Sequence, residues 1–175
     1  MKYCSNCGSA NLAFKIPEGD NLPRYICENC QTIFYQNPKI VTGTLPIWQD
    51  KILLCKRAIE PRYGLWTLPA GFMENNESVE QAAIRETSEE AKANVEQVKL
   101  YVMISLPNRN QVYMIFLAQL SDLNYAPGIE SLDVKLFTKD EIPWDNIAFP
   151  VIEKTLNYYF DDVTTDQFPL HVTLL

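Results

Sequence analysis

The sequence has no long hydrophobic run and comparatively few basic residues. No apolar stretch approaches the roughly 18 residues that a transmembrane helix needs, and the N-terminus lacks the basic and apolar regions of a signal peptide. These absences predict a cytoplasmic protein with no membrane partner. The 15 Lys and Arg are outnumbered by 22 Asp and Glu, for a net charge of −7. Because a broad nucleic-acid-binding surface needs clustered positive charge, no nucleic-acid partner is expected.

An anionic small molecule remains a reasonable ligand for this acidic chain. Bound metal ions can supply the positive charge that phosphates require, so the shortage of basic residues itself favours a cation-dependent site. The 175 residues are enough for one ordinary domain with a hydrophobic core, plus at most one small module. The mean hydropathy of −0.15 is typical of a globular protein.

Four of the five cysteines form two close pairs near the N-terminus. Nineteen residues separate the pair Cys4 and Cys7 from the pair Cys27 and Cys30. Four thiolates with this spacing can close a tetrahedron around Zn²⁺, which predicts a zinc ribbon at residues 1–36 and a main domain at 37–175. The alternatives are two disulfides, which suit secreted proteins, or four ordinary thiols. Cys55 lies in an apolar run and is expected to be a small buried residue.

The rest of the chain alternates between strand-like and helix-like patterns. Ser78 and Gln81 can form a capping box that begins a helix over 78–93, and a second helix is expected from about 149 to 160. This mixture predicts an α/β sandwich around a mixed sheet. Residues 161–175 have no clear pattern. The expected strands cover 39–48 and 51–57, which form a hairpin, and then 66–68, 95–105, 111–120 and 132–138.

The helix expected at 78–93 carries carboxylates on its apolar side. On a helical wheel, Glu86 and Glu90 fall on the same face as Val79 and Ala83, and Glu89 lies at its edge. Unpaired acids near an apolar face repel one another and resist desolvation. A solvated acidic face is the common alternative, but it would put the acids opposite the apolar residues. Divalent Mg²⁺ or Mn²⁺ would balance the charge, since both prefer oxygen ligands.

Residues 71–93 resemble the Nudix box. That motif is Gly, five residues, Glu, seven residues, then Arg-Glu-aliphatic-x-Glu-Glu-x-Gly-aliphatic. Together with the paired cysteines, the segments YQNPKIVTG, CKRAIEPRYGLWTLPAGFME and PGIESLDVKLF resemble the subgroup of Nudix hydrolases with an N-terminal zinc ribbon, so the resemblance omits only the C-terminal tail. The box positions are Gly71, Glu77, Arg85, Glu86, Thr87, Glu89, Glu90, Lys92 and Ala93, of which Thr87, Lys92 and Ala93 depart from the pattern.

The resemblance implies roles for the charged residues of the box. Glu86 and Glu90 would bind the catalytic Mg²⁺ or Mn²⁺, together with the carbonyl of Ala70, and Glu89 would bind directly or through water. Glu77 and Arg85 would brace the preceding loop against the helix. Gly71 would allow the backbone to approach the metal closely.

Residues outside the box are candidates for the base and for substrate binding. Glu130 is the candidate general base, with an exposed loop acid as the alternative. Arg57 and Arg62 can bind a phosphate, although either can equally be a surface ion-pair residue. Tyr63 and Phe149 are candidates to stack on a base or flavin, although aromatic residues are more often part of a core.

The implied reaction is hydrolysis of the diphosphate bond in a nucleoside diphosphate linked to another group, with ADP-ribose or FAD favoured. NADH or a nucleotide sugar is the alternative. NADH pyrophosphatases carry Ser-Gln-Pro-Trp-Pro-Phe-Pro after the box, whereas this chain has Ser105-Leu106-Pro107-Asn108. A non-enzymatic nucleotide sensor or zinc-ribbon binding protein is the alternative class, although the intact glutamates argue against it. The resemblance also implies a homodimer.

Overall fold

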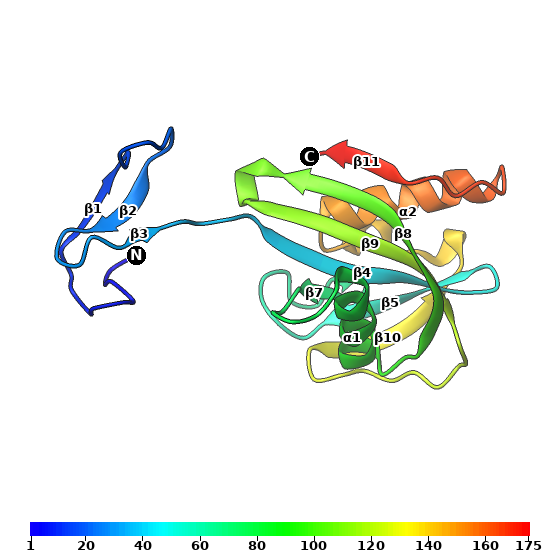
Figure 1. Cartoon of the computed structure of the whole chain (residues 1–175). Coiled ribbons are helices and arrows are strands. Elements are labelled where there is room, and N and C mark those ends of the chain that lie inside the picture. Colours follow the sequence, from blue (N-terminus) through cyan, green and yellow to red (C-terminus); the bar gives the residue numbers. More distant parts are fainter. The chain divides into compact units, whose positions relative to one another are not determined.

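The computed structural model describes residues 1–175 and divides into two compact units, Met1–Asn37 and Pro38–Leu175 (Figure 1). Each unit has a sheet of its own, with three strands in the first and eight in the second. Neither α-helix of the chain has the length and hydropathy required to cross a membrane.

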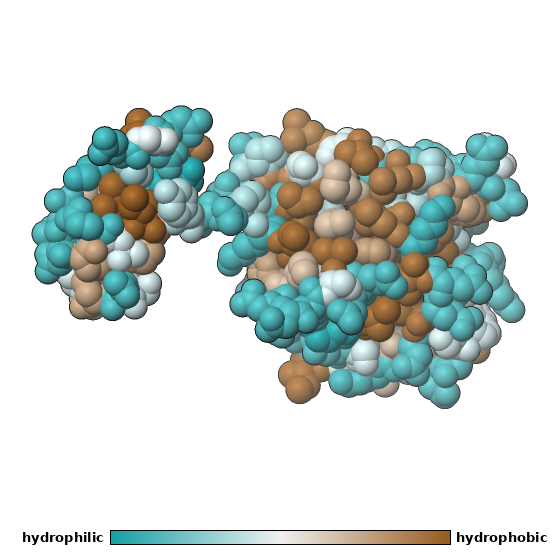
Figure 2. All heavy atoms as spheres, in the orientation of Figure 1, coloured by the Kyte–Doolittle hydropathy of each residue, from teal (hydrophilic) through white to brown (hydrophobic).

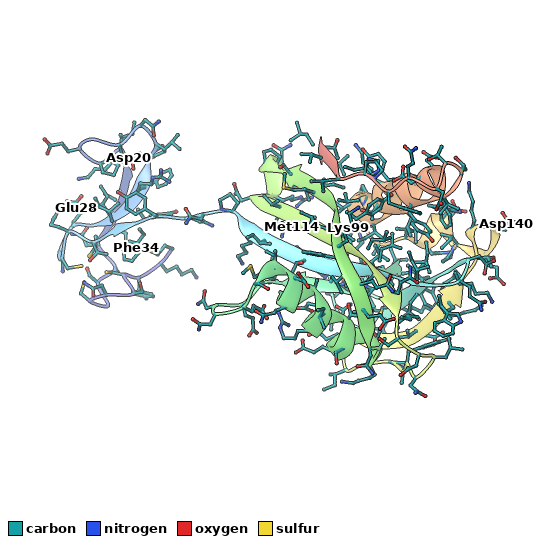
Figure 3. All side chains as sticks on the ribbon, turned by 45° about the vertical axis from the view of Figure 1, so that its right-hand side comes forward. Asp20, Glu28, Phe34, Lys99, Met114 and Asp140 are labelled. Carbon is teal, nitrogen blue, oxygen red and sulfur yellow. The ribbon has the colours of Figure 1, made fainter.

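The N-terminal unit is a small antiparallel sheet with very little core. Its strands are β1 (Leu12–Lys15), β2 (Arg24–Cys27) and β3 (Ile33–Phe34). Its buried residues are Cys4, Pro17, Ile26 and Cys27. Asp20, labelled in Figure 3, pairs with Arg24 at 3.1 Å. Figure 2 shows hydrophobic side chains on the surface of this unit, and its exposed large hydrophobic residues are Met1, Tyr3, Phe14, Ile16, Leu22 and Tyr35.

The C-terminal unit is built on a mixed sheet. Six strands follow the order β10-β5-β4-β9-β8-β11, while β6 pairs with β5 and β7 pairs with β4. The β4–β9 and β8–β11 pairs are parallel and the others are antiparallel. The strands are β4 (Lys39–Trp48), β5 (Lys51–Arg57), β6 (Trp66–Thr67), β7 (Ala70–Phe72), β8 (Val95–Leu106), β9 (Gln111–Leu120), β10 (Ser131–Phe137) and β11 (His171–Leu174).

The two α-helices cover opposite faces of this sheet (Figure 1). Successive residues of a strand point to opposite faces. On β5, Ile52 and Leu54 therefore join the larger core with α2 (Pro150–Val163), whereas Leu53 and Cys55 join a smaller core at the end of α1 (Val79–Ala91). The predicted α/β sandwich around a mixed sheet is confirmed, and so is the burial of Cys55.

Two strands of the C-terminal unit were not predicted from the sequence. β7 has only three residues, follows Pro69 and contains Gly71, a composition typical of a turn. It forms because β4 pairs with β5 only at Ile47 and Trp48, which leaves the earlier part of β4 free to pair with β7. β11, in the tail without a pattern, pairs in parallel with β8.

Short 3-10 turns and helix ends complete the unit. The capping box predicted at Ser78 and Gln81 is present, and the helix ends at Ala91, two residues before the predicted end. The second helix extends to Val163, three residues beyond the predicted end. The 3-10 turns are η1 (Pro107–Arg109), η2 (Lys139–Glu141) and η3 (Trp144–Asn146).

Candidate active site

Helix α1 is fixed to the sheet by threonine hydroxyl groups. Thr42 of β4 donates to the carbonyls of Val79 and of Met114, at 2.9 and 3.1 Å (Met114 is labelled in Figure 3). The hydroxyl groups of Thr44 and Thr87 lie 2.6 Å apart, and Thr87 also donates to the Ala83 carbonyl at 2.8 Å. The buried Thr87, which stands where the motif has an aliphatic residue, is thus satisfied by polar partners.

Glu86 and Glu90 are buried on the sheet side of α1, with 9% and 6% of their surfaces exposed. Burial raises the pKa of Glu86, and burial followed by repulsion from Glu86 raises the pKa of Glu90 to about 8. The Glu90 carboxylate accepts one hydrogen bond, from the Ala70 amide at 3.3 Å. A buried carboxylate with so few hydrogen-bond donors around it is suited to bind a cation.

Gly71 lies directly against the Glu86 carboxylate. A Cβ at this position would come within 2.4 Å of a Glu86 oxygen. Gly71 also pairs with Thr42 in the sheet, so the backbone has little freedom to move aside. A side chain at position 71 would therefore displace the Glu86 carboxylate from its present position.

Arg85 joins three acids at the edge of the site. It donates twice to Glu77, at 2.8 and 3.0 Å, and its Nη1 donates to Glu86 at 2.8 Å and to Glu89 at 3.1 Å. Glu77 also accepts from the Glu74 amide at 2.7 Å. The bonds from Arg85, followed by that from Glu74, lower the pKa of Glu77 to about 2. These bonds connect the loop after β7 to α1.

The loop before β10 brings Glu130 to the same site. The Gly128 and Ala126 amides donate to the carbonyls of Glu90 and Ala91, the last residues of α1, both at 2.9 Å. The Ala58 amide donates to the Glu130 carbonyl at 2.8 Å. Repulsion from Glu130 is among the smaller causes that raise the pKa of Glu86 and Glu90.

Gly128 is a site-forming residue to which the sequence analysis gave no role. A Cβ on Gly128 would overlap the Glu89 carbonyl, at 1.7 Å. Only glycine therefore lets the loop contact the end of α1. The available signal was its position two residues before the candidate base.

One cavity of about 1320 Å³ in the C-terminal unit is lined by Ala70, Gly71, Arg85, Glu86, Glu89, Glu90 and Glu130. Arg57, Arg62 and Phe149 also line it, and the Arg57 guanidinium lies 5.1 Å from the centre of the Phe149 ring. Neither arginine has a carboxylate partner within 4.0 Å, so the surface ion-pair alternative is not observed. Tyr63 is 57% exposed and does not line the cavity, so it is not brought together with the other candidates.

The glutamates of α1 are not gathered around one point as the four cysteine sulfurs are. Glu89 of α1 is exposed, and Arg85 contacts both Glu86 and Glu89. The buried and sparsely hydrogen-bonded Glu90 still has the chemistry of a Mg²⁺ or Mn²⁺ ligand, with the backbone of Ala70 beside it.

The four cysteines of the N-terminal unit fit a tetrahedral metal. All four sulfur atoms lie within 4.8 Å of one another, and the pairs Cys4–Cys30 and Cys7–Cys27 are 3.6 Å apart. Zn–S bonds of 2.3 Å in a tetrahedron separate the sulfurs by about 3.8 Å. All five cysteines are free thiols, which excludes the disulfide alternative.

Both units of the chain match known protein families. Residues 2–36 match the family model of the Nudix N-terminal zinc ribbon, and residues 38–155 match the NUDIX domain. The chain belongs to the Nudix hydrolase family. The predicted Nudix fold preceded by a zinc ribbon is therefore confirmed.

Several Nudix proteins resemble the chain over most of its length. The NAD-capped RNA hydrolase NudC of Vibrio vulnificus is 30% identical over 89% of this chain and 59% of its own length. The ADP-ribose pyrophosphatase of Methanocaldococcus jannaschii is 29% identical over 64% of this chain and 78% of its own. The chain thus spans about three-fifths of the NudC relatives it matches. A crystal structure of a NUDIX hydrolase from Nitrosomonas europaea has a TM-score of 0.95 and 55% identity, covering 100% of this chain and 99% of that one.

The Nudix box retains its helix end despite the loss of its late glycine. Lys92 occupies that position with φ of 51°, in the left-handed conformation that glycine adopts most easily, and its amide donates to the Ser88 carbonyl. The geometry at the end of α1, which the substitution had put in doubt, is thus kept at the cost of backbone strain.

Proposed function

We propose that this Nudix hydrolase cleaves the diphosphate bond of a nucleoside diphosphate linked to another group, with ADP-ribose or FAD as the favoured substrate. The observation that carries the proposal is the buried pair Glu86 and Glu90 on the wall of a cavity that also contains unpaired arginines. Buried carboxylates are stabilised by bound cations, and arginine side chains bind phosphate groups well.

The catalytic metal would be Mg²⁺ or Mn²⁺, and the metal of the ribbon would be Zn²⁺. Glu86, Glu90 and the Ala70 carbonyl would hold the catalytic ion, with Glu89 binding directly or through water. Exposure of Glu89 is compatible with a water-mediated contact. Cys4, Cys7, Cys27 and Cys30 leave no open position in a tetrahedral site, so the zinc would be structural.

The chain's own residues can then divide the work of hydrolysis. Bound divalent cations supply neutralisation of the phosphoryl charge and a more acidic water. Glu130 accepts the proton of the attacking water. Arg57 and Arg62 hold the second phosphate, and Phe149 stacks on the base. Glu77 and Arg85 keep the loop after β7 in place, so that Gly71 and Ala70 stay against the acids.

Three observations bear on the substrate. The relative from Methanocaldococcus jannaschii carries the name ADP-ribose pyrophosphatase, which supports ADP-ribose. The relatives named NAD-capped RNA hydrolase favour a second candidate, a substrate containing NAD or NADH, with or without RNA attached. Against it, η1 follows Ser105 and Leu106 where NADH pyrophosphatases have their proline-rich signature. A nucleotide sugar is a further alternative.

The decisive assay incubates the protein with Mg²⁺ or Mn²⁺ and ADP-ribose, FAD, NADH, nucleotide sugars or NAD-capped RNA. We expect AMP with ribose 5-phosphate from ADP-ribose, or AMP with FMN from FAD. Glu90→Gln should lose at least about a hundredfold in turnover. Equal inactivity of both proteins on all substrates would favour a non-enzymatic nucleotide sensor. Light scattering would test the expected homodimer.

A further inference from the structure

Every arginine of the C-terminal unit lines the same cavity. These four residues are Arg57, Arg62, Arg85 and Arg109, whereas only one of the unit's eight lysines, Lys92, lies there. The unit is acidic, with 12 basic and 19 acidic residues between 38 and 175. Its guanidinium groups are therefore concentrated at one place, against the overall charge. Guanidinium is the side chain best suited to phosphate because it can bind two oxygens at once.

Three of the four arginines keep guanidinium donors for a ligand, although Nε of Arg57 donates to the Pro61 carbonyl at 2.9 Å. Arg85 is occupied by Glu77, Glu86 and Glu89. No carboxylate lies within 4.0 Å of Arg57, Arg62 or Arg109. The two phosphates of a cleaved diphosphate would already contact the cations and the arginines beside the box. A third free arginine exceeds what a diphosphate alone requires.

Arg109 is separate from the other two arginines along the cavity. Arg57 and Arg62 belong to the segment after β5, whereas Arg109 ends η1, the turn between β8 and β9. The Asn110 amide donates to the Pro107 carbonyl at 3.1 Å, and the Lys39 amide donates to the Asn110 carbonyl at 2.9 Å. Two backbone bonds therefore fix the turn that carries Arg109.

The register of the strands indicates how far Arg109 lies from the glutamates. Tyr113 of β9 pairs with Val41, which pairs with Phe72 beside Gly71 and the acids. Gln111 lies two residues earlier on β9, which is about 7 Å along a strand, and Arg109 lies beyond it. Asn108 and Gln111 also line the cavity and add side-chain amide donors beside Arg109.

We infer that Arg109, with Asn108 and Gln111, forms a subsite for a phosphate ester outside the cleaved diphosphate. This inference rests on the proposed function. The substrate class becomes a nucleoside diphosphate derivative whose ribose carries a further phosphate. That group is either a terminal phosphate monoester or the phosphodiester that begins an attached nucleotide chain, since Arg109 can pair with both.

The experiment compares kcat/KM for three substrates that share one diphosphate. NAD has no further phosphate, NADP adds a 2′-phosphate, and an NAD-capped dinucleotide adds a 3′-phosphodiester. We expect NADP or the capped dinucleotide to exceed NAD by about tenfold, the worth of one charge-assisted hydrogen bond. Arg109→Gln should remove that preference. Lys135→Gln, which deletes a positive charge on β10 outside the cavity, should retain it.

The possible results separate this inference from the function on which it rests. A preference for NADP alone identifies a monoester, and a preference for the capped dinucleotide alone identifies a diester. Hydrolysis without either preference, or a preference that Arg109→Gln leaves intact, would overturn the subsite and leave the hydrolase proposal standing. Failure to hydrolyse these three substrates, ADP-ribose and FAD would overturn both. Thermal melting of Arg109→Gln would verify that the variant is folded.

Discussion

The two units of this chain present their candidate metal ligands in opposite ways. The four cysteine sulfurs of the N-terminal unit already lie within 4.8 Å of one another, in a unit whose other buried residues are only Pro17 and Ile26. The glutamates of α1 belong to a unit with two hydrophobic cores, and Arg85 already contacts Glu86 and Glu89. Metal should therefore hold the first unit folded, whereas in the second it should serve chemistry.

The largest expected effect is the loss of the ribbon when a cysteine is replaced. Cys27→Ser should unfold the N-terminal unit, because structural zinc contributes on the order of 10 kcal/mol to folding. Bound zinc, measured by atomic absorption, should fall from one ion per chain to none. The melting transition of the C-terminal unit should remain.

Cys55→Ser is the matched control for this experiment. Cys55 is buried in the smaller core of the C-terminal unit. Its replacement should leave zinc binding unchanged while lowering the stability of that unit. A Cys27→Ser protein that still binds one zinc with an ordered ribbon would break the comparison.

The second prediction concerns chemistry without loss of the fold. Glu130→Gln should lower kcat at least about a hundredfold with little change in metal affinity, because the amide cannot accept the proton of the water. The melting temperature should stay near that of the wild type. Asp133→Asn, on β10 outside the cavity, is the control and should alter kcat less than about twofold. Near-normal turnover of Glu130→Gln would remove Glu130 from the mechanism.

The third prediction is that the stability of the C-terminal unit depends on pH through Glu90. Burial, followed by repulsion from Glu86, raises the pKa of Glu90 from its usual 4.5 to about 8 in the folded chain. The folded state therefore binds this proton more strongly than the unfolded state does. The associated stability is present below pH 4.5 and is lost as the pH rises toward 8, an effect on the order of a few kcal/mol.

Thermal melting with zinc in place, but without added Mg²⁺ or Mn²⁺, measures this effect. Glu90→Gln should flatten the pH profile between 5 and 8 and should be more stable than the wild type at pH 8. Glu89→Gln, at an exposed position of the same helix, should keep the wild-type slope. An equal slope in the wild type and Glu90→Gln would contradict the assignment.

The smallest expected effect tests backbone strain at the end of α1. Lys92→Gly should raise the unfolding free energy of the C-terminal unit by about 1 kcal/mol, because glycine adopts the left-handed conformation without a Cβ penalty. Lys92→Ala removes the same charge but retains the strain. If the two variants were equally stable in urea titrations, the gain would come from the charge and not from the backbone.

Features with a short sequence range were predictable from the sequence. The capping box at Ser78 and Gln81 depends on residues three apart, and it is confirmed. The burial of Glu86 and Glu90 follows from helical periodicity. The hairpin of β4 and β5 follows from alternation around Gln49 and Asp50. In each case the decisive interactions lie within a few residues of each other.

Features that depend on distant segments were not predictable. β7 forms because β4 separates from β5, and β11 forms because its tail reaches β8. Position 128 needs glycine because its loop packs on the carbonyl of Glu89. Arg109 lines the same cavity as the glutamates because of where η1 lies in the fold. Tyr63, chosen as an aromatic near the box, is exposed and does not line that cavity.

The sequence by itself determined the family, the zinc ribbon, the acidic helix and its capping, because each of these depends on the spacing of residues that are close together in the chain. Only the tertiary structure decided which arginines share the cavity with the glutamates and how Glu130 comes near them. Spacing along a chain sets which groups share a helix face or form a close cysteine pair. Side chains from separate loops meet only where the packed sheet and helices bring their backbones together.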